Sequence, residues 1–249
     1  MTNNEVINVF SNPFELWSYR DATYEERLEH MKKHHTPLLR VKHQFEGQIE
    51  SAFDAAVHII RKQEDNTLKS FIRSALNEDP AYHNLCHKMQ TSIPPVLSAY
   101  QTSYPNYNRS AVEQAINQSG VLLPDGQYLF HGGCWPSKSD VLTTDRPLST
   151  TFDPQVALAN AAWWNKIYKA NRFDLMVVRV TEPQTKAYFF GPDSEFSHEL
   201  EIVFASGAHL KRMDMNQQAV THIKASKSID GQVVDQKMVP AYVIEVELC

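Results

Sequence analysis

Two glutamates, Glu199 and Glu201, stand two residues apart in the segment FSHELEIVFASG at residues 196–207. Side chains alternate between the two faces of a β-strand, so both carboxylates would point the same way on a strand. A fixed carboxylate can stabilise positive charge that develops in a transition state, and a second one can accept a proton from a nucleophile. The same pattern is also typical of a solvated strand face, or of an edge strand whose charges deter pairing.

Two shorter segments could belong to the same site. YLFHGG at residues 128–133 predicts a strand that ends in a histidine and two glycines, and LSTTF at residues 148–152 predicts a second short strand. Each has an ordinary explanation, because a histidine before glycines is typical of a turn and such hydroxyls often bond local backbone groups. The chain has no G-x-G-x-x-G loop, no phosphate-binding G-x-x-x-x-G-K-[ST] loop and no G-x-S-x-G elbow. A bound nucleotide would therefore need other residues.

In this order, the three segments resemble the ADP-ribosyltransferase superfamily, in its toxin-like branch with an ExE motif. That family has a basic residue at the end of a first core strand and then a Ser-Thr-Ser/Thr strand. A later strand carries an aromatic residue, two spacers, Glu or Gln, any residue and the catalytic Glu. FSHELE at residues 196–201 matches this last element position by position. The resemblance covers about residues 118 to 249 with part of the preceding helical region, and the first 60 residues match no such pattern.

The resemblance implies cleavage of NAD⁺ between nicotinamide and ribose, without a metal ion. It implies that Glu201 is catalytic and contacts the ribose 2′-hydroxyl, that Glu199 serves the acceptor, and that Phe196 touches the acceptor. The residues it assigns to NAD⁺ binding are His131, Gly132, Ser149, Thr150 and Thr151. Among these, the serine would hold the catalytic glutamate in one rotamer, and the glycine would let its backbone approach the nicotinamide carboxamide.

The first element departs from the arginine-modifying branch, which has arginine where this chain has His131. FHGG is closer to the histidine-glycine element of the diphtheria-toxin and poly(ADP-ribose) polymerase branch. That branch, however, has tyrosine where this chain keeps Ser149, and the gap between the two residues is short. Arg146 could supply the positive charge for the pyrophosphate instead.

The acceptor and the partners follow from the same residues. Glu199 favours a protein arginine, because a carboxylate can hold a guanidinium bidentately and accept its proton. RNA or DNA stays open as the acceptor, since cations and histidines gather in HMKKHHTPLLRVKH at residues 30–43, although an ordinary solvated basic face has the same composition. An NAD⁺ glycohydrolase that uses water and a non-catalytic interaction protein also stay open. A toxin would require a neutralising antitoxin or immunity partner.

The composition sets outer limits on the function. The chain has 249 residues, 42% hydrophobic and 21% charged, which is enough for one large or two small domains. The formal charge of -5 does not indicate a general nucleic-acid-binding protein, and three scattered cysteines fit a reducing compartment. No apolar run approaches the roughly 20 residues of a membrane span. The N-terminus lacks the features of a classical signal peptide, so we expect a cytoplasmic site of action, with leaderless secretion left open.

Periodicity predicts helices in the first half and strands in the second. Helical segments are expected at residues 22–35, 43–62, 66–79 and 110–120, with another at 153–170 that begins after Asp153 as N-cap. Further strands are expected at residues 175–180, 186–190, 200–205 and 241–248. We therefore predict an α+β fold. A helical N-terminal region at 1–117 would precede a core at 118–249, for which the resemblance implies two mainly antiparallel sheets.

Overall fold

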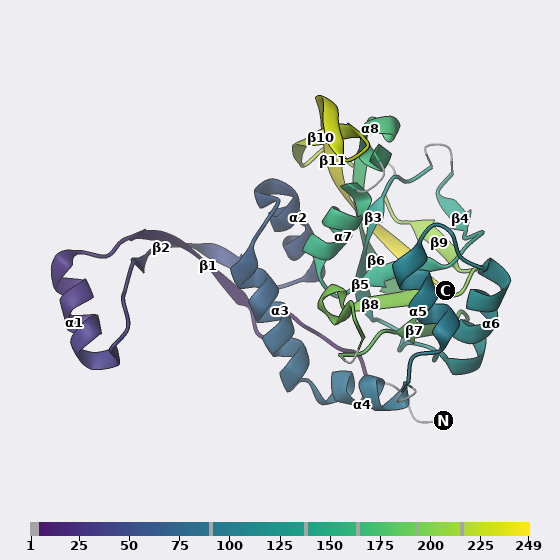
Figure 1. The fold of residues 1–249 in the computed structure, drawn as a ribbon, viewed down its shortest axis with the longest axis horizontal. Coiled ribbons are helices and arrows are strands. Elements are labelled where there is room, and N and C mark those ends of the chain that lie inside the picture. Colours follow the sequence, from purple (N-terminus) through teal and green to yellow (C-terminus); the bar gives the residue numbers. More distant parts are fainter. Residues whose placement is uncertain (1–4, 90–91, 137–138, 163–164, 193, 215–216) are drawn as a thin grey trace. The chain divides into compact units, whose positions relative to one another are not determined.

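The computed structural model describes residues 5–89, 92–136, 139–162, 165–192, 194–214 and 217–249 (Figure 1). The chain forms two compact units, Phe10–Ser51 and a larger one that combines Met1–Val9 with Ala52–Cys249. The predicted border between residues 117 and 118 lies inside the larger unit, where helices give way to strands. None of the described helices is long and apolar enough to cross a lipid bilayer.

The smaller unit is an antiparallel hairpin with a helix between its strands. Its elements are β1 (Phe14–Asp21), α1 (Tyr24–His34) and β2 (Arg40–Ile49). The predicted helix α1 begins with a capping box, in which Thr23 and Glu26 each accept from the other's backbone N–H. Arg20 adds two hydrogen bonds to the Glu26 carboxylate, at 2.6 and 2.8 Å. No residue of α1 is buried, so these end contacts define the helix.

The single helix predicted for residues 43–62 is wrong in its first part. Residues 43–49 belong to β2, and helix α2 (Ala52–Lys62) begins after it. Gly47 has a φ of 142°, which no α-helix accommodates, and β2 pairs with β1 along its length. Phe45 is 49% exposed, so its helical spacing from the later apolar residues does not reflect a buried stripe.

Four helices follow in the larger unit; the sequence predicts those at residues 66–79 and 110–120 but not the one at residues 95–103. They are α3 (Asn66–Glu78), α4 (Pro80–Lys88), α5 (Pro95–Ser103) and α6 (Arg109–Ser119). Asp65, Asp79 and Asn108 cap α3, α4 and α6 through their side chains. The helix predicted at residues 110–120 ends at Gly120, which is the C-cap of α6. A Cβ on Gly120 would lie 2.6 Å from the carbonyl oxygen of Ala187. The glycine lets the end of α6 pack against a strand.

The strands form one large, mainly antiparallel sheet (Figure 1). Their bounds are β3 (Tyr128–Gly133), β4 (Val141–Thr143), β5 (Leu148–Thr151), β6 (Phe173–Val180), β7 (Ala187–Phe189), β8 (Glu201–Phe204), β9 (His209–Arg212), β10 (Thr221–Ile229) and β11 (Gln232–Leu248). The order is β4-β9-β11-β6-β3-β5-β8-β7, with β10 paired to β11, and β11–β6 is the parallel pair. The prediction of two sheets in the core is confirmed only in part, because the core strands form one sheet with two arms, which the single register pair Phe130↔Thr151 joins between β3 and β5.

Helix α7 (Pro154–Ala162) packs against β3, β5 and β6. Asp153 caps it as predicted, with the N–H of Gln155 donating to Asp153 Oδ1 at 2.9 Å. The predicted helix at 153–170 is interrupted, because Asn165 has a φ of 59° and a separate helix α8 (Lys166–Ala170) follows. A Cβ on Gly132 would lie 1.9 Å from the carbonyl oxygen of Ala157 in α7. Gly132 therefore permits the close approach of α7 to β3, which is a different reason for glycine from the one that the sequence suggested.

Replacing Gly132 by alanine should therefore destabilise the fold. The added methyl group meets backbone rather than a flexible side chain, so α7 must move, and overpacking of this kind costs about 1–3 kcal/mol. Urea unfolding of Gly132→Ala measures the loss. Gly191→Ala is the matched control, because the nearest atom to its new Cβ lies at 3.9 Å, an ordinary contact. Equal stability of the two variants would contradict this account of Gly132.

Candidate active site

Glu201 is a buried acid at the start of a buried strand. Strand β8 lies between β5 and β7, and all of its residues are buried, with Glu201 only 7% exposed. The two ordinary explanations, a solvated strand face and a charged edge strand, are therefore wrong for this residue. A carboxylate that loses water must be compensated by hydrogen bonds or it becomes protonated.

Two side chains provide that compensation by bonding both carboxylate oxygens of Glu201. Ser149 Oγ donates to Oε1 at 2.5 Å, and Gln101 Nε2 donates to Oε2 at 2.8 Å. Ser149 is placed by the sheet register, since Thr151 lies opposite Glu201 and Ser149 is therefore its diagonal neighbour on the same face. Gln101 comes from α5, a hundred residues away in sequence. The predicted contact of Ser149 with Glu201 is present.

The balance of these effects leaves Glu201 a weaker acid than usual. Burial raises the pKa of Glu201, the bonds from Ser149 and Gln101 oppose that shift, and the charge of Glu199 adds to it. The pKa of Tyr100 in α5 is also raised, first by burial and then by the charge of Glu201. The carboxylate is thus destabilised by its surroundings and held by two specific donors.

Glu199 does not lie on the strand, so the prediction that both glutamates share one strand face is wrong. Ser197–Glu199 forms a turn of 3-10 helix (η2), and Leu200 has a φ of 49° before β8 begins. Thr151 Oγ1 donates to the carbonyl of Glu199 at 2.6 Å, and Arg73 Nη2 donates to that of His198 at 3.2 Å. The turn is thereby tied to β5 and α3. Polar and apolar residues alternate in this segment, which predicts a strand. The hydrogen bonds that hold it as a turn go to its backbone carbonyls, so the side-chain pattern does not reveal them.

The carboxylate of Glu199 is half-buried and makes no hydrogen bond or ion pair with the described residues. Burial raises its pKa. Phe196, at the start of the turn, is partly exposed, and its ring lies 6.2 Å from that of His198. The turn therefore presents an uncompensated carboxylate and an aromatic ring beside the buried Glu201.

The three hydroxyl residues of β5 have separate roles. Only Ser149 reaches a glutamate side chain. Thr150 Oγ1 donates to the carbonyl of Ile202 at 2.9 Å. Thr151 Oγ1 donates to the carbonyl of Glu199 and accepts from the N–H of Asp153 at 3.0 Å. Both threonines are buried. They fasten β5 to β8 and to the turn, so nothing in these contacts offers them to a nucleotide.

His131 bridges the point where β3 and β5 separate. Its Nδ1 donates to the carbonyl of Ser149 at 2.6 Å, just beyond the single pair that joins the two strands. Burial lowers the pKa of His131, the bond to Ser149 opposes this, and the charges of Lys166 and Arg146 lower it further. A neutral ring that donates from Nδ1 presents a lone pair at Nε2. The ring is therefore an acceptor toward any ligand.

Two cations, Arg146 and Lys166, act on the ring of His131, and Tyr100 lies near Glu201. Arg146 is exposed and forms no hydrogen bond or ion pair with the part of the chain that the structure describes. Lys166 Nζ lies 5.4 Å from the ring centre of Tyr104, which stacks on Tyr107 with centroids 5.9 Å apart. Positive charge next to aromatic faces suits a nucleotide with phosphates. Among the described residues, no group of His, Cys, Asp or Glu could hold a metal ion.

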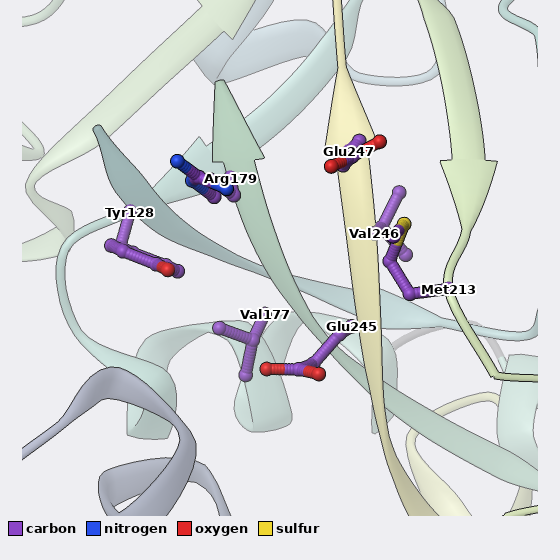
Figure 2. Close-up of a pocket in the computed structure, with 7 residues that line it drawn as sticks. All are labelled: Tyr128, Val177, Arg179, Met213, Glu245, Val246 and Glu247. Atoms are coloured by element: carbon purple, nitrogen blue, oxygen red, sulfur yellow. The ribbon is translucent and has the colours of Figure 1, made fainter. Parts of the chain in front are cut away.

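A separate hollow of about 150 Å³ is lined by other residues (Figure 2). Its lining residues are Tyr128, Val177, Arg179, Met213, Glu245, Val246 and Glu247. Tyr128 is three positions before His131 on β3, so the two side chains point to opposite faces. None of the predicted site residues lines it, and it is smaller than ordinary ligand pockets.

The sequence did not reveal Gln101, Lys166 or the tyrosines at 100, 104 and 107. A glutamine on an amphipathic helix carries no chemical signal, and only the fold brings α5 to β8. The run YQTSYPNY at residues 100–107 is dense in tyrosine, which was an available hint of a ring cluster.

Comparison with known proteins gives matches at the level of structure. No protein-family model and no curated protein sequence matches the chain. The solved structures include Vis, an ADP-ribosyltransferase from Vibrio splendidus, with 16% identity and a TM-score of 0.39 over 80% of this chain and 90% of Vis. They also include the enzymatic component C2-I of the Clostridium botulinum C2 toxin, with 12% identity and a TM-score of 0.34 over 67% of this chain. A third is BECa of C. perfringens, an ADP-ribosylating toxin solved with NADH, with 10% identity and a TM-score of 0.35 over 68% of this chain.

Among these solved structures, Vis is described as an ADP-ribosyltransferase and BECa as an ADP-ribosylating toxin. The three sequence segments resemble the ADP-ribosyltransferase superfamily. That the chain belongs to its branch with an ExE motif stays a prediction. The chain spans 45% of the length of C2-I and 46% of BECa. At TM-scores below 0.5 these similarities do not decide what the chain does, and the activity has to follow from the site.

The raised pKa of Glu201 predicts a pH-dependent stability. The folded chain binds this proton more tightly than the unfolded chain, so ionisation of Glu201 costs stability as the pH rises through its folded pKa. That cost is absent below the ordinary pKa of 4.5. In Glu201→Gln, the free energy of unfolding should therefore rise relative to that of the wild type as the pH increases above 4.5. Denaturant unfolding across this range measures the gain, with the exposed Glu195→Gln as control. A difference that is independent of pH would contradict the buried, ionising Glu201.

Proposed function

We propose that this chain is a mono-ADP-ribosyltransferase that cleaves NAD⁺ and transfers ADP-ribose to a macromolecular acceptor, with a protein arginine favoured. The observation that carries the proposal is the buried carboxylate of Glu201, held by Ser149 and Gln101, beside the unpaired carboxylate of Glu199. Oriented carboxylates at a reacting sugar carbon are the usual means of stabilising an oxocarbenium ion.

In the first half of the reaction, the bond between ribose C1′ and the nicotinamide nitrogen breaks. The electron pair leaves with nicotinamide, which becomes neutral, and C1′ takes on oxocarbenium character. The charge of Glu201 stabilises this cation more than the ground state. Each carboxylate oxygen keeps a lone pair after bonding Ser149 or Gln101, so the ribose 2′-hydroxyl can donate to it.

Positive charge near His131 supports binding of the dinucleotide. Arg146 and Lys166 would contact the pyrophosphate, and Nε2 of His131 would accept from a ribose hydroxyl. His131 then differs from the arginine of the arginine-modifying branch, because a neutral ring cannot replace its charge. The two cations would supply that charge instead.

In the second half, Glu199 would serve the acceptor. An arginine guanidinium is always protonated, so its attack on C1′ requires a base that receives a proton as the bond forms. The half-buried carboxylate of Glu199, with its pKa raised by burial, suits that role. Phe196 would pack against the arriving side chain.

The structure of the smaller unit favours a protein over a nucleic acid as acceptor. Two cations of the basic 30–43 segment already have partners, since Lys42 lies 3.3 Å from Glu15 and Arg40 lies 3.7 Å from Asp21. The segment is therefore less free to neutralise phosphates than its composition suggests. A cytoplasmic site of action and a neutralising partner complete the proposal.

Incubation with ³²P-labelled NAD⁺ and cell lysate tests the proposal. The wild type should release nicotinamide and label a protease-sensitive, hydroxylamine-sensitive product, while Glu201→Gln should be slower by about 10² or more. The folded variant should still be stabilised thermally by NAD⁺ without added metal. Nuclease-sensitive label would move the acceptor to nucleic acid, and free ADP-ribose alone would indicate a glycohydrolase. Normal turnover by Glu201→Gln would overturn the mechanism.

Loss of the second glutamate should separate the two halves of the reaction. Glu199→Ala removes the proton acceptor but leaves the Ser149–Glu201 contact, and water can enter the vacated position. Labelling of macromolecules should fall by about 10² or more, while nicotinamide is still released slowly. Glu195→Ala, an exposed glutamate on the same loop, is the matched control. Wild-type labelling by Glu199→Ala would remove the arginine assignment.

A further inference from the structure

Helix α5 delivers a neutral donor to the candidate catalytic carboxylate. Gln101 Nε2 lies 2.8 Å from Glu201 Oε2, while Ser149 takes the other oxygen at 2.5 Å. The two donors come from different elements, one from helix α5 and one from the neighbouring strand β5. A carboxylate bonded at both oxygens has one orientation, whereas one bonded by Ser149 alone could rotate about its last side-chain torsion.

The helix that carries Gln101 is anchored independently of this hydrogen bond. Leu97 is fully buried and Tyr100 is 5% exposed, and α5 packs against α6. The Tyr100 ring contacts that of Tyr107 edge to face, with centroids 4.8 Å apart. Gln101 itself is only half-buried. Its amide is therefore held in place by the helix, and its removal should leave the packing of α5 intact.

We propose that Gln101 is a positioning residue for Glu201, which fixes the carboxylate toward the nicotinamide ribose and keeps it available as an anion. This inference rests on the proposed function, because the orientation matters only if Glu201 meets a ribose. No sequence motif marks Gln101.

The electrostatics support the same assignment. A donor bonded to a carboxylate stabilises its charged form, so Gln101 lowers the pKa of Glu201 against the opposing effect of burial. The other titratable groups that act on Glu201 are Glu199, whose charge raises the same pKa, and Tyr100, whose own pKa is raised so that it stays neutral. Ser149 cannot compensate for a lost amide, since its single hydroxyl proton is already used on Oε1.

Two substitutions change the donor in different ways. Gln101→Met keeps the length of the side chain without a hydrogen-bond donor. Gln101→Glu keeps its shape but places a second carboxyl against Glu201, so the two groups would share a proton. Thr102→Ala is the control on the same helix, because Thr102 is exposed and bonds only the backbone of its own helix.

The test measures nicotinamide release from NAD⁺ as a function of pH for the full chain. In Gln101→Met, kcat should fall on the order of ten- to a hundredfold, the usual effect of losing a hydrogen bond to a charged group. KM should change little, and the acid limb of the kcat profile should move to higher pH. Gln101→Glu should move that limb further, and Thr102→Ala should match the wild type. A purely structural role predicts lower thermal stability with an unmoved limb, and that result would overturn the assignment.

A second measurement separates failure of this inference from failure of the proposed function. NMR titration of the side-chain carboxyl of Glu201 reports its pKa without any turnover. If the wild type does not cleave NAD⁺, the proposed function fails, yet a higher Glu201 pKa in Gln101→Met still supports the contact. An unchanged pKa of Glu201 in that variant overturns the positioning role whether or not the enzyme is active.

Discussion

The burial of one carboxylate governs the arrangement of the site. Glu201 opens a strand that is covered on both faces, where an uncompensated charge would cost several kcal/mol. The fold meets that cost with the hydroxyl of Ser149 and the amide of Gln101, which requires β5, β8 and α5 to converge on one point. The carboxylate is left oriented and poorly hydrated, which are the properties that electrostatic stabilisation of an oxocarbenium ion needs.

The surrounding structure follows from that convergence. The strands β3 and β5 share a single register pair and then separate, and the ring of His131 bridges the gap through Ser149. Helix α7 comes close enough to cover β3 only because Gly132 has no side chain. Hydrogen bonds to its backbone carbonyls hold the turn before β8 in place. The turn therefore does not depend on the carboxylate of Glu199, whose burial no hydrogen bond from a described residue compensates. One glutamate is thus fixed by hydrogen bonds, and the other is left free to take up a proton.

The sequence predicted those parts of the fold that depend on local chemistry. The end of the helix at residues 110–120, the cap at Asp153 and the contact of Ser149 with Glu201 all rest on residues close to the feature or on a family pattern. The helical spacing of Phe45 and Ile49 predicts helix for residues 43–49, which belong to β2, although Gly47 opposes a helix. The hairpin of β10 and β11 was missed despite its Asp-Gly turn at residues 230–231. Gln101 and Lys166 could not be found, since only tertiary packing brings them to the site.

The most direct measurement is a crystal structure of Glu201→Gln with NAD⁺, since this variant should bind the substrate and fail to consume it. The account predicts the nicotinamide ribose within hydrogen-bond distance of residue 201, the pyrophosphate between Arg146 and Lys166, and Nε2 of His131 within hydrogen-bond distance of a ribose hydroxyl. NAD⁺ bound elsewhere, for example in the hollow beside Tyr128, or no binding at millimolar concentration, would contradict it.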